Sequence, residues 1–146
     1  MYRIILALTV FCGAATAAQA DTRYFCSADD KDVRFTVESG FEAGGGHKLN
    51  HLRGALVAKN DDVPQALKKI AVSSENLMHH WSHDGELRLE IFYEGGDDAN
   101  GQGISLIVIA GQRGKSMNTF SGTYELALDG GAKAVTATGK VTCGSK

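Results

Sequence analysis

The residues best suited to chemistry are three histidines within five positions, followed by an acidic residue. They are His79, His80 and His83, and the acidic residue is Asp84. Residues four apart share a face in a strand and lie close together on a helix, so His79 and His83 point the same way in either structure. Imidazole nitrogens with a carboxylate suit zinc, copper or nickel. The segment therefore has two interpretations: a metal site at His79, His83 and Asp84, or an exposed stretch that leads into a turn.

Other motifs match known catalytic or ligand-binding motifs only in part. Residues 111–116 end in Gly-Lys-Ser, but the phosphate-binding loop needs a glycine where this chain has Ile109. Residues 96–107 resemble a calcium loop, yet Gly96 and Ile107 stand where carboxylate ligands are required. The chain contains no Gly-x-Ser-x-Gly sequence. We therefore expect a protein that is not an enzyme and needs no cofactor.

The first twenty residues have the organisation of a secretory signal peptide. Arg3 precedes an apolar stretch at residues 4–11, and residues 18–20 read Ala-Gln-Ala, a cleavage site of the small-x-small type. We expect cleavage after Ala20. Residues 21–146 would then form a single exported domain, periplasmic or secreted, without a membrane anchor.

Cys26 and Cys143 are the two cysteines left once the signal peptide is removed, and export decides their oxidation state. Paired thiols persist as disulfides in oxidising compartments, so these two are expected to pair with each other. A disulfide needs Cα atoms within roughly 7 Å. The first and last elements of the exported domain must therefore lie side by side.

The composition is that of an ordinary soluble domain. The 146 residues are 43% hydrophobic and 22% charged, with a formal net charge of −2. These values exclude a collagen, a disordered tail, a coiled coil and a multi-pass membrane protein. The absence of a basic stripe argues against nucleic acid or an anionic membrane as the main partner.

Apolar residues recur with a period of two along most of the chain, which is the signal of β-strands. Alternation is clear at residues 33–37, 87–93, 120–128 and 132–143, and glycine-rich turns separate the runs. Residues 104–110 are apolar on both faces, so this strand is expected to be central or covered. Pro64 and the next five residues favour a short helix, and a second helical turn is expected from Ser74 toward His80.

This pattern predicts an all-β fold of seven or eight strands with one or two short helices. Hairpin connections give an antiparallel meander, because parallel pairing would require long crossovers. A bridge between the first and last strands favours a small closed barrel, with a flattened sandwich as the alternative.

A family resemblance rests on the chain ends and one late strand. Tyr24-Phe25-Cys26 opens the exported domain, a strand with Cys143 closes it, and residues 120–124 read Phe-Ser-Gly-Thr-Tyr. This arrangement resembles the small exported β-barrels that inhibit c-type lysozyme in Gram-negative bacteria. The resemblance implies that Ser121 and Tyr124 enter the lysozyme cleft. The family motif would, however, place its tyrosine at Glu125, and its tryptophan follows the motif whereas Trp81 lies upstream.

Three functional hypotheses remain. The first is a non-catalytic binding protein for an envelope protein or polysaccharide, with c-type lysozyme as one case. The second is a carrier of a small apolar ligand inside the barrel, and the third is metal binding by the histidine cluster. Large residues at expected inward positions favour a filled core over a carrier's cavity; they are Phe35, Leu89, Leu106, Tyr124 and Leu126. The first hypothesis is preferred.

Overall fold

The computed structural model describes residues 22–41, 48–83, 86–111 and 119–145, and in these residues the chain is all β. The signal peptide expected at residues 1–20 lies outside them. Three segments form single turns of 3-10 helix, η1 (Gln65–Leu67), η2 (Ser74–Asn76) and η3 (Asp97–Ala99). The described strands are β1 (Thr22–Asp29), β2 (Val33–Phe41), β3 (Leu49–Ala58), β4 (Lys69–Ser73), β5 (Leu77–His83), β6 (Glu86–Glu94), β7 (Gly103–Gly111), β8 (Thr119–Asp129) and β9 (Val135–Ser145).

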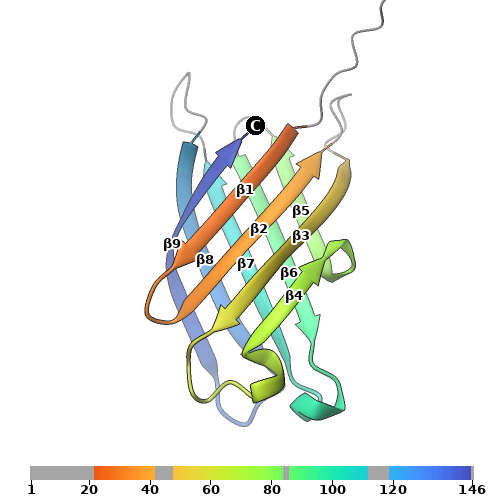
Figure 1. Cartoon of the computed structure of the whole chain (residues 1–146), viewed down its shortest axis with the longest axis vertical. Helices are drawn as coiled ribbons and strands as arrows, with labels where there is room; N and C mark the ends of the chain where they lie inside the picture. Colours follow the sequence, from red (N-terminus) through yellow and green to blue (C-terminus); the bar gives the residue numbers. More distant parts are fainter. Residues whose placement is uncertain (1–21, 42–47, 84–85, 112–118, 146) are drawn as a thin grey trace, which may run out of the picture.

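The nine strands form one sheet in the order β4-β3-β2-β1-β9-β8-β7-β6-β5, and every pairing is antiparallel. The sheet curls into a nearly closed barrel (Figure 1). The predicted antiparallel meander closed into a small barrel is therefore confirmed. The described strands number nine rather than seven or eight, and the two expected helices are the single turns η1 and η2.

The extra strand arises because the chain changes partners at η2. β4 pairs with the second half of β3, whereas β5 pairs with the first part of β6. At the change, the hydroxyl of Ser74 accepts a hydrogen bond of 2.9 Å from the backbone N–H of Leu52 in β3. The backbone N–H of Ser73 donates to Asn76 Oδ1 at 2.9 Å. The two edges of the sheet are thus consecutive in the sequence, and the barrel stays open between them.

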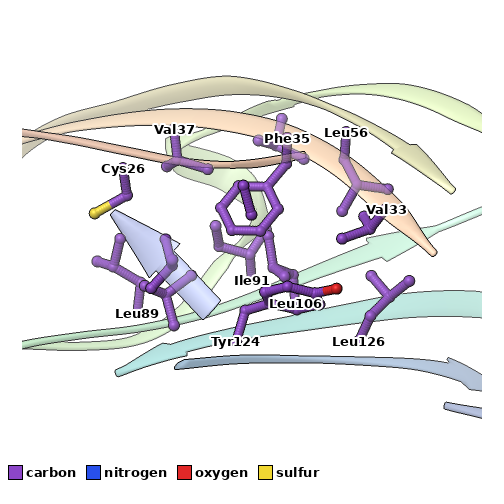
Figure 2. Packing of buried hydrophobic residues seen from close by; sticks show 14 of the residues in the cluster. Cys26, Val33, Phe35, Val37, Leu56, Leu89, Ile91, Leu106, Tyr124 and Leu126 are labelled. Carbon is purple, nitrogen blue, oxygen red and sulfur yellow. The ribbon is translucent and has the colours of Figure 1, made fainter. Parts of the chain in front are cut away.

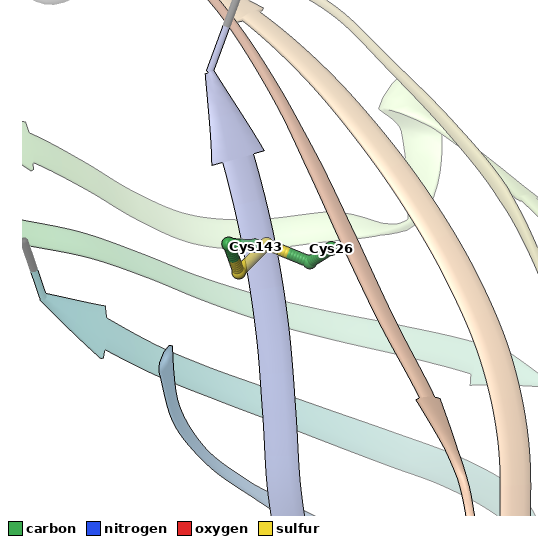
Figure 3. Close-up of a disulfide and its surroundings, with 2 residues drawn as sticks. All are labelled: Cys26 and Cys143. Carbon is green, nitrogen blue, oxygen red and sulfur yellow. A yellow bond between two sulfur atoms is a disulfide. The ribbon is translucent and has the colours of Figure 1, made fainter. Parts of the chain in front are cut away.

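The barrel is closed on its other side by pairing of the first and last strands. Cys26 of β1 lies opposite Cys143 of β9 in the ladder, with 4.0 Å between their Cα atoms. A disulfide joins them across 117 residues of sequence (Figure 3). The predicted pairing of these two cysteines is confirmed, as is the neighbourhood of the chain's first and last elements.

Large side chains fill the middle of the barrel (Figure 2). Phe35 and Tyr124 meet edge to face with ring centroids 5.5 Å apart, an arrangement that the quadrupoles of aromatic rings favour. Leu56, Ile91 and the other inward residues of the alternating strands surround this pair. The core is therefore packed as the sequence predicts.

One polar contact fastens the β1–β2 turn to the core. Asp30 accepts hydrogen bonds from the backbone N–H groups of Asp32 and Val33 at 2.9 and 3.0 Å, and from the hydroxyl of Tyr124 at 2.5 Å. Gly139 makes room for this contact, because a Cβ there would lie 2.5 Å from Asp30 Oδ2 and from the Tyr124 ring. The β1–β2 turn and β8 are thereby joined.

Candidate functional site

β5 and β7 carry three of the four exposed large hydrophobic residues among the described residues. Met78, Trp81 and Ile109 are 56%, 53% and 46% exposed. Trp81 lies opposite Arg88 in β6, and Arg88 lies opposite Ile109 in β7. Side chains opposite one another in neighbouring strands share one face of the sheet, so Trp81, Arg88 and Ile109 form a row across the wall. Met78 is exposed on the same edge strand as Trp81. Met78, Trp81 and Ile109 are called the β5 face below.

The register of β5 explains why Met78 is turned out. The ladder with β6 shifts between Leu77 and His79, which leaves Met78 as an extra residue at a β-bulge. A bulge bends the strand and redirects its side chains. The side chain of Leu77 packs against the core, whereas Met78 is exposed.

Two charged pairs lie within and beside the β5 face. His79 Nδ1 lies 2.9 Å from Glu90 Oε2, and Arg88 donates to Glu86 at 3.2 Å. A hollow of about 230 Å³ lies between Trp81 and Ile109, with His79, Arg88 and Glu90 along it. The surface therefore combines two exposed apolar side chains with charged ones, because Arg88 stands between Trp81 and Ile109 in the row. Arginine and aromatic residues are both enriched in protein-binding surfaces.

β5 is also an edge strand of the sheet. Among the described strands it forms a ladder with β6 alone, because it ends the sheet. Edge strands present backbone N–H and C=O groups to any extended segment that approaches them. The β5 face thus stands beside an edge that can accept another strand.

The structure sets His79 and His80 on different sides of β5, whereas the metal site predicted at His79, His83 and Asp84 lies partly outside the described residues. His79 faces outward toward Glu90, whereas the ring of His80 contacts Phe41 of β2 with centroids 5.8 Å apart. His83 ends β5, but its side chain and all of Asp84 lie outside the described residues. No group of three metal-ligating side chains occurs among the residues described. Metal binding by His79, His83 and Asp84 stays a prediction.

The two residues that the lysozyme-inhibitor resemblance implies lie on opposite faces of β8. Ser121 is exposed on the outer wall, beside Thr142 of β9. Tyr124 is only 2% exposed, and its hydroxyl donates to Asp30 in the interior. A partner on the outer wall therefore reaches Ser121 but not the ring of Tyr124.

The β5 face was not identified from the sequence, although one signal pointed to it. The apolar run at residues 104–110 predicts a strand that is central or covered, and β7 is central, between β6 and β8. Its inward residues Ile104, Leu106 and Val108 are buried, but Ile109 on the other face is exposed. An apolar outer position on an antiparallel strand is the signal that could have indicated a docking surface.

Comparison with known proteins adds no assignment: no protein-family model, curated protein or solved structure matches the chain. No helix within the described residues has the length and apolar character that a bilayer crossing requires.

Proposed function

We propose that this chain is a non-catalytic, exported binding protein that engages a protein of the cell envelope through the β5 face. The observation that carries the proposal is that Trp81 and Ile109 lie in one row on the outer wall, while Met78 is exposed beside Trp81 on the edge strand β5. Tryptophan is among the residues that contribute most to binding energy in protein interfaces.

The edge of β5 supports a protein partner over a polysaccharide. An extended segment of a protein can add to a sheet edge through backbone hydrogen bonds, while neighbouring side chains provide specificity. Here the β5 face lies beside the edge, so one partner segment can pair with β5 while another packs on Trp81. The disulfide between Cys26 and Cys143 suits an oxidising compartment, in line with export.

The proposal is tested by affinity capture from an envelope extract of the native host, followed by mass spectrometry. The bait is the domain of residues 21–146, compared with a double variant Trp81→Ala, Ile109→Ser. The matched control is Phe25→Ala, because Phe25 is the other exposed large hydrophobic residue of the described chain and lies on β1. We expect a protein that wild type and Phe25→Ala retain and that the double variant loses by about tenfold or more. Equal retention by all three baits, or retention of polysaccharide alone, contradicts the proposal.

C-type lysozyme is one candidate partner, which the resemblance of the chain ends suggests. Its residual activity is measured with purified domain at about a tenfold molar excess, far above the stoichiometry that a tight inhibitor needs. We expect inhibition that Trp81→Ala weakens. Full lysozyme activity at that excess removes this candidate and leaves the capture experiment to identify another.

A further inference from the structure

A second hollow lies on the outer wall of β1, β2 and β3, away from β5 in the sheet order. The ladder sets side chains of these strands in rows: Phe25, Glu38 and Arg53 form one row. The next row holds only small side chains, those of Ser27, Thr36 and Ala55. In Figure 1 these three strands face the viewer.

The row of small side chains makes a channel in the wall. Residues two apart on a strand stand about 7 Å apart on the same face, so a row of small residues leaves a strip as wide as one extended chain. Gly54 alternates with the outward residues Arg53 and Ala55 and pairs with the buried Val37, so it presents backbone to the floor of the hollow. The hollow has a volume of about 560 Å³, within the range of small-molecule sites.

A cluster of cationic side chains stands at one side of this channel. Glu38 contacts Arg53 at 2.7 Å, His51 at 3.1 Å and Arg23 at 3.9 Å. The hydrogen bonds from Arg53, and then from His51, hold the pKa of Glu38 below its usual value. The Glu38 side chain is 11% exposed, whereas the side chains of Arg23 and Arg53 are more than half exposed. Two arginines against one carboxylate leave a positive charge facing the solvent.

The cluster and the channel are continuous. A hollow of about 320 Å³ lined by Arg23, His51 and Arg53 shares Glu38 and Arg53 with the larger one. His51 can lie there because its partner in the ladder is Gly40, where a Cβ would be 2.5 Å from the imidazole. The wall thus offers a cationic end that continues into a strip of small side chains.

We propose that this wall binds a single-chain amphiphilic carboxylate, with the carboxylate held by Arg53 and Arg23 and the apolar chain along Ala55 and Gly54. Charge complementarity selects the head group, since Arg presents a planar fork of donors that matches a carboxylate. The strip, one chain wide, selects the tail. A free molecule rather than a membrane surface is favoured, because the chain's net charge is −2 and only two arginines are involved. The site is separate from the β5 face and does not depend on the function proposed for it.

The test is titration of the folded domain with decanoate by isothermal calorimetry. Hexanoate keeps the head group and shortens the tail, and decyltrimethylammonium keeps the tail and reverses the charge. Arg53→Gln removes the head-group contact. Ala55→Phe fills the strip and leaves every ion pair of the cluster in place. Arg88→Gln is the matched control, an exposed arginine of β6 that pairs with Glu86.

We expect saturable one-to-one binding of decanoate below about 1 mM, weakened about tenfold by Arg53→Gln and by Ala55→Phe and unchanged by Arg88→Gln. Hexanoate and decyltrimethylammonium should each bind at least about tenfold more weakly. The proposal is overturned if decanoate does not saturate. It is also overturned if Ala55→Phe, with a wild-type circular dichroism spectrum, binds decanoate as wild type does. Sedimentation with phosphatidylglycerol vesicles in the absence of decanoate binding overturns it in favour of a membrane surface.

Discussion

The substitution Tyr124→Phe removes one hydroxyl from the core and leaves the ring in place. That hydroxyl donates to Asp30 at 2.5 Å, and Asp30 keeps its two backbone donors when it is lost. A hydrogen bond to a charged group contributes about 1.5–3 kcal/mol to stability. The carboxylate of Asp30 is not left without partners. We therefore expect Tyr124→Phe to lower the free energy of unfolding by about 2 kcal/mol at pH 7, near the lower end of that range.

The loss should depend on pH. Desolvation raises the pKa of Asp30, but the hydrogen bonds from Tyr124 and from the backbone of Asp32 and Val33 outweigh it and lower the pKa. A carboxyl whose pKa is lowered by folding stabilises the protein above its unfolded pKa of about 4, and this stability is lost as the pH falls through the lowered value. The difference in free energy of unfolding between wild type and Tyr124→Phe should therefore be smaller at pH 3 than at pH 7.

The assay is urea unfolding followed by far-ultraviolet circular dichroism at pH 7 and pH 3. Tyr93→Phe is the control, because Tyr93 packs against the core and no hydrogen bond of its hydroxyl occurs among the described residues. We expect Tyr93→Phe to change the free energy of unfolding by less than about 0.5 kcal/mol. Equal effects of the two substitutions at pH 7, or a larger effect of Tyr124→Phe at pH 3, would refute the role assigned to the Asp30 contact.

Three further changes test the fold. Replacing Cys26 and Cys143 by serine should lower the free energy of unfolding by up to about 5 kcal/mol, the entropic value for so long a closed loop; a midpoint unchanged in urea contradicts this. Gly139→Ala should cost about 1–3 kcal/mol, because its Cβ would meet the Tyr124 ring, and a stability equal to wild type would show that the contact is not close. Ser74→Ala should lower the free energy of unfolding by about 1 kcal/mol and speed amide hydrogen exchange in β3. Unchanged exchange in β3 would contradict a role for Ser74 where the chain passes from pairing with β3 to pairing with β6.

The fold could be predicted because its main signals are local. Alternation at Val33, Phe35 and Val37 specifies a strand with one buried face, and glycine-rich turns separate such strands. One long-range contact, between Cys26 and Cys143, then determined which strands meet. The meander and its closure follow from these two kinds of information.

The partner change and the β5 face could not be predicted, because they depend on register. Residues 64–80 carry helix-favouring signals. Most of this segment is nevertheless extended, because β4 pairs with β3 and β5 pairs with β6. The outward position of Met78 depends on the bulge in β5, which the sequence pattern does not mark. Trp81 and Ile109 lie in one row only because the ladder places both opposite Arg88.

The placement of Tyr124 shows the limit of a short motif. The resemblance takes Ser121 and Tyr124 together, but residues three apart on a strand point to opposite faces. Alternation with Phe120 and Leu126 already indicates that Tyr124 faces inward, and the structure buries all three.

The central proposal is that β5 faces a partner in the envelope, and site-specific photo-crosslinking in the native host tests it most directly. A photoreactive residue is placed at position 78 on β5 or, as the control, at position 136 on the outer wall of β9, where Thr136 is exposed. We expect a covalent adduct with one envelope protein from position 78 and none from position 136. Adducts of the same protein from both positions, or from position 136 alone, would contradict it.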